Sequence, residues 1–523
     1  MPAQMTSNGA EALIRTLVGA GVDTCFTNPG TSEIHFVAGL DSVPEMRAIL
    51  TLFEGVATGA ADGYARMAGV PAATLLHLGP GLGNGLANLH NARRAKVPVL
   101  NIVGDHATYH AQYDPPLQSD IETIARNVST WVRTSSSAGG LAHDTVEAIV
   151  AATGPPGQVA TLIVPADVSW QDGVEPADPP PPVAPPPVPA ETVEAVAKAL
   201  RGTRRTAILL GGSALRADGL VAAGRIAATT GARLFSERST PRLERGAGLP
   251  VVERLAYWPE LASAQLDGLE HLILADAQPP VAWFAYPGAR SSLAPDGCEV
   301  QELSPPTSNV VTSLQALVEA LGAADAEPTL QTALVPPRPE GPLTAEKVCQ
   351  AVGAMLPEGA ILSDEAITSA AALPASTAGA PRHDWLTLTG GAIGQGLPVA
   401  VGAAVACPDR PVIALQADGS ALYTIQSLWT MAREQLDVTV VIFNNRGYAI
   451  LDAELKRLDG PGAGDAAKAL LSLGNPDLDF VSLGTGLGVP SRRVDTGEQL
   501  TEALGEALAD PGPHLIEAGI PVV

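Results

Sequence analysis

The stretch "ADGSALYTIQSLWTMAREQLDVTVVIFNNRGYAI", residues 417–450, decides the fold of this chain. An apolar run, 411–417, ends in Asp418, and a second apolar run, 438–443, ends in two asparagines, of which the second is Asn445. The residues between the two runs have the pattern of a helix. A strand, a crossover helix and a second strand form a parallel pair, whose carboxyl ends meet at one edge of a sheet. We therefore expect Asp418 and Asn445 to lie side by side.

The same alternation of short apolar runs and helix-like runs fills the rest of the chain, as in "PAATLLHLG", "TAILLGG" and "GAILSDE". Two proline-rich stretches interrupt it, and proline favours an extended linker because it fixes φ and lacks a backbone donor. The sequence predicts an α/β protein of three consecutive domains, each a mostly parallel sheet with helices on both faces. The predicted parts are a first domain (1–173), a linker (174–190), a central domain (191–326), a second linker (327–342) and a third domain (343–523).

Composition excludes several classes of function. The 523 residues are 46% hydrophobic and 16% charged, which permits a large buried core. The formal net charge of −24 argues against a nucleic-acid partner, because phosphates would be repelled. The four cysteines form no CxxC pair and are interpreted as free, mostly buried thiols. The N-terminus lacks a signal-peptide core and no apolar run approaches ~20 residues, so we expect a cytoplasmic protein without a membrane partner.

The chemistry of Asp418 and Asn445 points to a metal. A carboxylate and an amide oxygen are hard ligands that suit Mg²⁺ or Ca²⁺. The backbone groups of the adjacent turn, at Gly419 and Ser420, can hold a diphosphate, whose oxygens would complete the coordination of the metal. The sequence therefore predicts a Mg²⁺–diphosphate site at this sheet edge.

At this point the chain resembles a known family. The residues "ADGS…NNRGY" are similar to the signature of thiamine-diphosphate enzymes, G-D-G followed about 25 residues later by N-N, with Ala417 in the place of the first glycine. The resemblance implies thiamine diphosphate and Mg²⁺ as cofactors. It implies three metal ligands, the side chains of Asp418 and Asn445 and the backbone carbonyl of Gly447. It also places Gly419, Ser420 and Tyr448 in the cofactor site.

Two further stretches resemble the same family. "LFEGVATGAADGYAR" (52–66) implies that Glu54 is the acid that hydrogen-bonds to N1′ of the cofactor and drives its 4′-nitrogen to deprotonate C2. The small residues after Glu54 indicate a closely packed helix. "GGAIGQGLP" (390–398) implies that Ile393 supports the bent cofactor and that the Gly391 carbonyl accepts from the 4′-amino group. "SDEAIT" (363–368) resembles a further loop on the diphosphate side.

The resemblance covers nearly the whole chain and is to the branch of the acetolactate synthase large subunit and benzoylformate decarboxylase. It implies pyrimidine-binding, central and diphosphate-binding domains in this order. The implied reaction decarboxylates a 2-oxo acid to a C2-bound enamine, then protonates it or ligates it to an aldehyde or ketone acceptor. It also implies a homodimer or homotetramer with active sites between subunits, in which Glu54 and Asp418 of one site come from different subunits.

Four residues are predicted to line the substrate pocket. "FTNPGTSEIHF" (26–36) resembles benzoylformate decarboxylase, which places Thr31 near the substrate carboxylate and makes His77 a candidate for proton transfer. Ile450 and Glu454 follow the metal loop one helical turn apart and would share a face over the pocket.

Two alternatives stay open from the sequence. One is acetolactate synthase acting on pyruvate, although Pro116 and Leu117 replace the phenylalanine and glutamine of that enzyme. The other, of a different class, is a non-catalytic regulatory paralogue. The central segment "LLGGSALRADG" keeps little of the flavin-binding pattern, so we expect no FAD.

Overall fold

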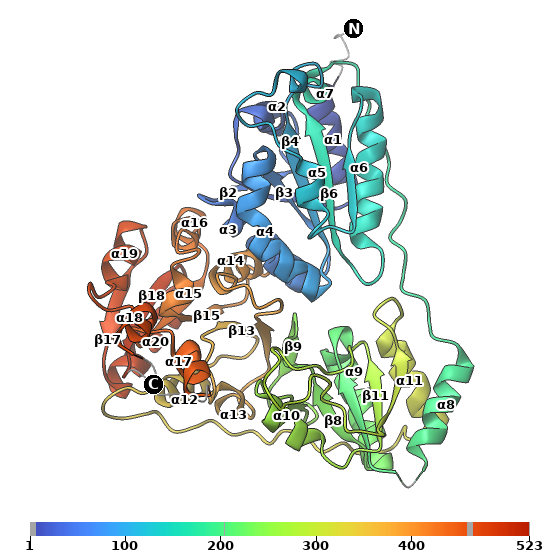
Figure 1. Ribbon diagram of the computed structural model, residues 1–523, viewed down its shortest axis with the longest axis vertical. Helices are drawn as coiled ribbons and strands as arrows, with labels where there is room; N and C mark the ends of the chain where they lie inside the picture. Colours follow the sequence, from blue (N-terminus) through green and yellow to red (C-terminus); the bar gives the residue numbers. More distant parts are fainter. Residues whose placement is uncertain (1–6, 203, 458–463, 522–523) are drawn as a thin grey trace. The chain divides into compact units, whose positions relative to one another are not determined.

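The structure is a computed structural model that describes residues 7–202, 204–457 and 464–521 (Figure 1). It confirms the predicted class, an α/β fold with three mostly parallel sheets flanked by helices. The contacts within the chain define two compact units. The larger unit comprises Met1–Pro182, Val335–Thr377 and Leu386–Val523, and the smaller unit comprises Val183–Leu334 and Ala378–Trp385. The boundaries of the three predicted domains stay a prediction.

The first sheet of the larger unit is parallel throughout and has the strand order β2-β1-β3-β4-β6-β5. Its strands are β1 (Thr24–Thr27), β2 (Arg47–Leu50), β3 (Ala72–Leu76), β4 (Val99–Asp105), β5 (Trp131–Thr134) and β6 (Val159–Pro165). The accompanying helices are α1 (Gly9–Gly19), α2 (Ile34–Gly39), α3 (Glu54–Ala68), α4 (Leu78–Ala95), α5 (Ile121–Ala125), α6 (Ala138–Thr153) and α7 (Ala166–Trp170), with short 3-10 turns η1 (Thr31–Glu33), η2 (Leu40–Ser42) and η3 (Ala111–Tyr113).

Helices cover both faces of this sheet, which explains why its central strands are apolar along their whole length. All residues of β3 are buried. α1 and α6 lie side by side on one face (Figure 1), where Leu13 and Leu141 share a core with Leu75. On the other face, Ala57 of α3 and Leu82 of α4 share a second core with residues such as Leu76.

The second sheet of the larger unit contains the two strands that end beside Asp418 and Asn445. Its strands run in the order β17-β18-β16-β15-β13, all parallel. They are β13 (Ile361–Glu365), β15 (Val412–Ala417), β16 (Val438–Asn444), β17 (Ser491–Val494) and β18 (His514–Gly519). The helices are α12 (Ala345–Met355), α13 (Leu373–Ser376), α14 (Gly396–Ala406), α15 (Asp418–Ala421), α16 (Ser427–Glu434), α17 (Ala449–Lys456), α18 (Asp465–Leu471), α19 (Phe480–Gly486) and α20 (Gly497–Ala509).

The smaller unit has its own parallel sheet, in the order β10-β8-β7-β11-β12. Its strands are β7 (Thr206–Leu210), β8 (Arg233–Ser236), β10 (Glu253–Arg254), β11 (His271–Ala275) and β12 (Glu299–Ser304). In addition, β9 (Leu243–Arg245) pairs antiparallel with residues 383–385 of β14 (His383–Thr387). The helices are α8 (Ala190–Leu200), α9 (Ala217–Thr230), α10 (Pro259–Leu266) and α11 (Val310–Leu321), with the 3-10 turn η4 (Gly212–Leu215).

α3 and α14 pack with their backbones in close approach, as the small residues of α3 predict. A Cβ atom added to Gly63 would lie 2.2 Å from the Val399 carbonyl oxygen, and one added to Gly402 would lie 1.9 Å from the Ala60 carbonyl oxygen. Only glycine fits at both positions, since real Cβ atoms do not approach so closely. This contact holds the helix that begins at Glu54 against the helix that follows the predicted cofactor loop.

Two predictions for the whole chain concern membrane-spanning helices and the cysteines. Among the helices within the described ranges, none is long and apolar enough to cross a bilayer. Of the four cysteines, predicted to be mostly buried, Cys25 and Cys349 are buried, whereas Cys298 and Cys407 are only partly buried.

Candidate active site

The turn at Asp418 and the asparagine pair lie side by side, as the sequence predicts. β15 and β16 are neighbouring parallel strands, and Ala417 is paired with Phe443 at their carboxyl ends. Asp418 follows directly and is 2% exposed. Its Oδ2 accepts a hydrogen bond from the backbone N–H of Arg446 at 2.6 Å, and its Oδ1 accepts from that of Gly419 at 2.7 Å. The carboxylate is therefore fixed between the two loops.

The electrostatic state of Asp418 fits a cation. Burial raises the pKa of Asp418 above its ordinary value, and the backbone N–H groups of Gly419 and Arg446 lower it in part. A buried carboxylate is costly unless it is paired or coordinates a metal. The Asp418 carboxylate has backbone donors in both loops, and coordination of a metal would offset the remaining cost of its burial.

The two asparagines have different surroundings. The Nδ2 of Asn444 donates to Oε1 of the buried Glu517 at 2.8 Å, and its Oδ1 is buried without a hydrogen-bond partner. The Oδ1 of Asn445 instead accepts from the backbone N–H of Gly447 at 3.0 Å, within the loop that also contacts Asp418. Asn445 is thus the asparagine on the side of the predicted metal site.

The donor set of the predicted site would be one carboxylate, one amide oxygen and the backbone carbonyl of Gly447. Such oxygens suit Mg²⁺, which usually keeps part of its shell for water and phosphate. Across the described part of the chain, no three His, Cys, Asp or Glu side chains gather as a metal cluster. The predicted site is of another kind, with a single acidic ligand, so the residues present fit the predicted ion.

Residues beside Asp418 form a tight turn under an aromatic ring. A Cβ atom added to Gly419 would lie 2.5 Å from the ring of Tyr448, so the ring packs directly on this glycine. Ser420 lies in the short helix α15, and its Oγ accepts from Nε2 of Gln416 at 2.6 Å. Burial raises the pKa of Tyr448, and so do the nearby Tyr423 and Asp418. The predicted cofactor residues Gly419, Ser420 and Tyr448 therefore lie close together.

The loop that contains Gly391 and Ile393 precedes α14. Gly391 has a φ of 81°, a backbone conformation that glycine adopts readily, and it is exposed. Ile393 is half-buried. The next carbonyl, that of Gly394, accepts from Thr424 Oγ1 at 3.0 Å and from Asn88 Nδ2 at 3.2 Å. The loop is therefore anchored on both sides, while the two predicted cofactor residues keep accessible surface.

Glu54 is the first residue of α3 and is 6% exposed. Its Oε2 accepts from Nδ2 of Asn84 at 2.9 Å. A Cβ atom added to Gly81 would lie 3.3 Å from Glu54 Oε1 and 3.4 Å from the Cβ of His77. Glu54 and His77 therefore border the same glycine of α4.

Three predicted residues follow the carboxyl ends of neighbouring strands. The order β2-β1-β3 places Glu54, Thr31 and His77 after adjacent strands at one edge of the first sheet. Thr31 is exposed, and the side chain of His77 is 23% exposed. The ring of His77 packs on Gly30, where a Cβ atom would lie 2.0 Å from Nδ1.

Sequence reasoning missed the partner of His77. The Nδ1 of His77 lies 2.8 Å from Oε2 of Glu33 and 3.2 Å from Oγ of Ser32. Glu33 is 4% exposed, and its Oε2 also accepts from the backbone N–H of Gly30 at 2.9 Å. The spacing of Gly30 and Glu33 is that of a capping box, which is the signal that the sequence offered.

Ile450 and Glu454 lie on α17, directly after the loop that contains Asn445 and Gly447. Both are partly exposed, and none of the residues of this helix is buried. Their separation of one turn puts them on one face, but their place in the substrate pocket stays a prediction. The predicted residues thus form two groups in the larger unit, one beside the first sheet and the other beside the second sheet.

Comparison with known proteins adds the family. The N-terminal TPP binding domain of thiamine pyrophosphate enzymes matches residues 7–127, and the C-terminal TPP binding domain matches residues 369–518. The chain is 56% identical to a predicted acetolactate synthase large subunit of Mycobacterium tuberculosis H37Rv (IlvX), over 98% of this chain and 99% of that protein. It is 29% identical to benzoylformate decarboxylase of Pseudomonas aeruginosa, over 95% and 96%.

A solved structure shares the fold. The thiamine diphosphate-dependent 4-hydroxybenzoylformate decarboxylase of Rhodococcus jostii RHA1 matches with a TM-score of 0.85 and 24% identity, over 99% of this chain and 100% of that one. The chain belongs to the thiamine pyrophosphate enzyme family, in the branch of acetolactate synthase large subunits and benzoylformate decarboxylases.

Proposed function

We propose that this chain is a thiamine-diphosphate- and Mg²⁺-dependent enzyme that decarboxylates a 2-oxo acid and passes the remaining fragment to a proton or to a carbonyl acceptor. The observation that carries the proposal is the pair of fixed carboxylates, Asp418 between the two loops and Glu54 buried at the start of α3. When bound, thiamine diphosphate supplies a nucleophilic C2 carbon that adds to the 2-oxo carbon and accepts the electron pair left when CO₂ departs.

The protein would hold the cofactor at two places. Asp418, Asn445 and the carbonyl of Gly447 would bind Mg²⁺, while Gly419, Ser420 and Tyr448 would surround the diphosphate. The carbonyl of Gly391 would accept from the 4′-amino group, with Ile393 under the bend. The fixed geometry of both loops supports this arrangement.

Glu54 would donate a hydrogen bond to N1′ and favour the imino form of the pyrimidine. Its burial supports this role, because a hydrogen bond shielded from water is electrostatically stronger than one made in solvent. Asn84 keeps the side chain in place by its bond to Oε2.

Thr31 and His77 would handle the substrate, with Thr31 near its carboxylate. Glu33 faces Nδ1 of His77, so a proton on that nitrogen points at the carboxylate and leaves Nε2 to give or take the proton of the substrate. Ile450 would narrow the pocket, and Glu454 would face it from α17.

Thiamine diphosphate and Mg²⁺ would be the only cofactors. After β7, the turn at Gly211 and Gly212 lies against two carboxylates: added Cβ atoms would lie 2.8 Å from Glu237 Oε2 and 1.8 Å from Asp276 Oδ2, respectively. Diphosphates bind beyond the carboxyl ends of such strands, and carboxylates there repel them. This supports a smaller unit without FAD.

The proposal includes a homodimer or homotetramer with shared active sites and a cytoplasmic location. The family resemblance supports the first, and free buried thiols such as Cys25 support the second.

The test is product analysis with thiamine diphosphate and Mg²⁺. Pyruvate, longer 2-oxo acids and benzoylformate are each supplied with and without an aldehyde acceptor, and CO₂ and carbon products are quantified. We expect CO₂ together with an aldehyde or a coupled product, and loss of both in Glu54→Gln. Absence of CO₂ from every acid, despite cofactor binding, would contradict the proposal and favour the regulatory paralogue.

Acetolactate synthase is the second candidate, and the 56% identity to the Mycobacterium tuberculosis relative favours it. Pyruvate alone would then yield acetolactate. Acetaldehyde without acetolactate would decide for the decarboxylase.

A further inference from the structure

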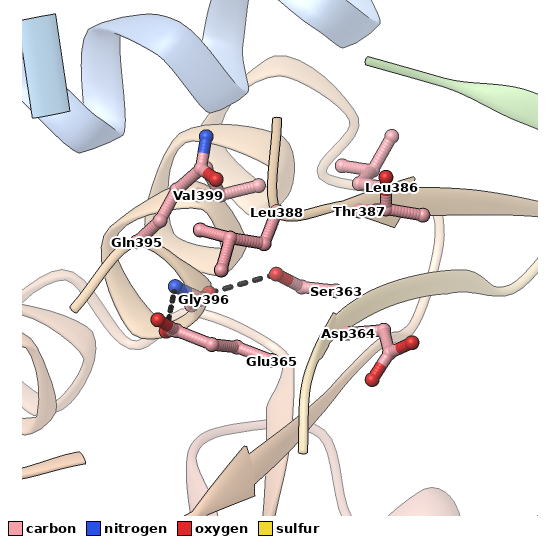
Figure 2. Close-up of a pocket in the computed structure, with 9 residues that line it drawn as sticks. All are labelled: Ser363, Asp364, Glu365, Leu386, Thr387, Leu388, Gln395, Gly396 and Val399. Carbon is pink, nitrogen blue, oxygen red and sulfur yellow. Dashed lines mark hydrogen bonds between the residues drawn. The ribbon is translucent and has the colours of Figure 1, made fainter. Parts of the chain in front are cut away.

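A buried carboxylate that the proposed function does not use lies beside the cofactor loop. Glu365 is the last residue of β13 and is 1% exposed. One oxygen of its carboxylate accepts from the backbone N–H of Gly394 and the other from that of Gly396, both at 2.6 Å. Figure 2 shows Glu365 directed toward Gly396, whereas the neighbouring Asp364 points away. Glu365 is thus bound to protein donors rather than to solvent.

These donors lie at the start of α14: Gly396 is its first residue, and Gly394 precedes it by two residues. The first N–H groups of a helix have no partner within the helix, and Gln395 at the N-cap makes no side-chain capping bond. Glu365 supplies the missing acceptor from another element, and its negative charge suits this end of the helix dipole. Ser363 on the same strand donates to the carbonyl of Gly396 at 2.8 Å. β13 therefore holds the Gly396 peptide from two sides.

The surroundings of Gly396 leave no room for a side chain at this position. A Cβ atom added there would lie 2.4 Å from Gln416 Oε1 and 2.8 Å from the Cβ of Glu365. The hollow that Glu365 shares with residues such as Val399 is too narrow for a water molecule. The acceptor for the N–H groups of Gly394 and Gly396 is thus the Glu365 carboxylate itself.

Glu365 also connects the loop to the metal-binding turn. Nε2 of Gln416 donates to Glu365 Oε2 at 3.0 Å and to Ser420 Oγ at 2.6 Å. Burial raises the pKa of Glu365 to about 7, and the N–H groups of Gly396, Gln416 and Gly394 lower it in part. The chain of bonds runs from the loop through one carboxylate to the turn at 418–420.

We infer that Glu365 is a positioning residue, whose carboxylate fixes the loop that carries Gly391 and Ile393 relative to the turn that carries Asp418 and Ser420. It would touch neither substrate nor cofactor. Its effect on the cofactor rests on the proposed function, because the two segments are the ones proposed to hold the pyrimidine and the diphosphate. The effect of Glu365 on the order of the loop does not depend on the proposed function, and it can be measured in the cofactor-free protein.

The test compares wild type, Glu365→Gln and the control Glu502→Gln, which neutralises an exposed carboxylate on α20. Glutamine keeps the size of the side chain but turns one acceptor into a donor that faces an N–H group. In cofactor-free protein, we expect amide hydrogen exchange in 394–396 to be at least about tenfold faster in Glu365→Gln and unchanged in the control. By calorimetry with Mg²⁺, we expect the thiamine diphosphate Kd to rise at least about tenfold in Glu365→Gln alone.

Unchanged exchange in Glu365→Gln would overturn the inference, and so would faster exchange with a wild-type Kd. If the wild type binds no thiamine diphosphate, the proposed function is wrong, and so is the inferred effect of Glu365 on the cofactor. The hydrogen-exchange result still shows, independently of the cofactor, whether Glu365 orders the loop. If Glu365→Gln does not fold, Gln416→Met tests the same link, because it removes only the donor between Glu365 and Ser420. A Kd equal to that of the wild type in Gln416→Met would then overturn the inference.

Discussion

Glu54 is the residue on which the proposed chemistry depends most. Its carboxyl group is buried at the start of α3 and is held by Asn84. Glu54→Gln should keep the fold, because glutamine has the same shape and Asn84 can still donate to its amide oxygen. Turnover should fall by roughly 10²–10⁴-fold, the usual contribution of a positioned acid or base. CO₂ release measures the loss, and far-UV circular dichroism checks the fold; near wild-type turnover would exclude Glu54 as the acid.

The asparagine pair allows a matched comparison at the metal site. Asn445→Ala removes a proposed Mg²⁺ ligand, so the Kd for thiamine diphosphate with Mg²⁺ should rise at least about tenfold. Asn444→Ala removes the donor to the buried Glu517 and should instead cost about 1–3 kcal/mol in the free energy of unfolding, with little change in that Kd.

Calorimetry and urea unfolding separate the two effects. Asp418→Ala serves as the positive control and should abolish Mg²⁺-dependent binding. An equal loss of cofactor affinity in Asn444→Ala and Asn445→Ala would contradict the assignment of Asn445 as the ligand.

The proximity of Asp418 to Asn445 could be predicted from the sequence, whereas the contacts that Glu33 makes with His77 and Glu365 with the loop could not. The first follows from the rule that consecutive parallel strands end at one sheet edge. Glu33 and Glu365 reach their partners across long separations, such as that from Glu33 to His77, and a single sequence does not reveal such pairs. In sequence, each is a glutamate in a polar turn, which usually lies in solvent.

At the scale of elements, the contact between α3 and α14 connects the helix of Glu54 to the helix after the cofactor loop. Gly402→Ala would place a methyl group against the Ala60 carbonyl and force the two helices apart. We expect a loss of about 1–3 kcal/mol in the free energy of unfolding, the usual cost of overpacking. Urea denaturation measures it.

Gly139→Ala on α6 is the matched control, because an added Cβ atom there meets nothing within 4 Å. It should leave stability unchanged or raise it by up to about 1 kcal/mol, since alanine favours the helix. If Gly402→Ala is as stable as this control, the backbone contact does not hold the two helices together.

Element types were predicted better than element ends. The sequence indicates a helix between β15 and β16, and the structure has α16 there, but also the short α15 at the metal-binding turn itself. Asp418 and Gly419 are poor formers of a helix interior, and this turn is held by the local bond from the Gly419 N–H to Asp418 and by the tertiary bond from Arg446 to Asp418.

At the scale of the whole molecule, distant parts of the chain form one unit. Arg66 on α3 makes a fully buried ion pair with Asp62 at 2.7 Å, and its guanidinium also donates to the carbonyl of Thr387 at 2.9 Å and to Thr389 Oγ1 at 3.0 Å. The proline-rich stretches suggest separate domains, but these contacts unite the first and last parts of the chain in the larger unit. The sequence does not reveal this, because Thr387 and Thr389 lie 321 and 323 positions from Arg66.

The proposed assembly gives the last prediction. If Glu54 and Asp418 of one active site come from different subunits, two inactive variants can complement each other. In a mixed dimer of Glu54→Gln and Asp418→Ala, one site carries both substitutions and the other carries neither. Random reassembly makes half of the dimers mixed, so CO₂ release should recover to about a quarter of the wild-type rate.

Each variant, unfolded and refolded alone in the same way, is the control and should stay inactive. Sedimentation velocity should show the same oligomer in every sample. If the oligomer forms but the mixture stays inactive, both residues of a site belong to one subunit. The dependence on mixing thus measures directly whether the active site is shared, because a site within one chain would always carry one of the two substitutions.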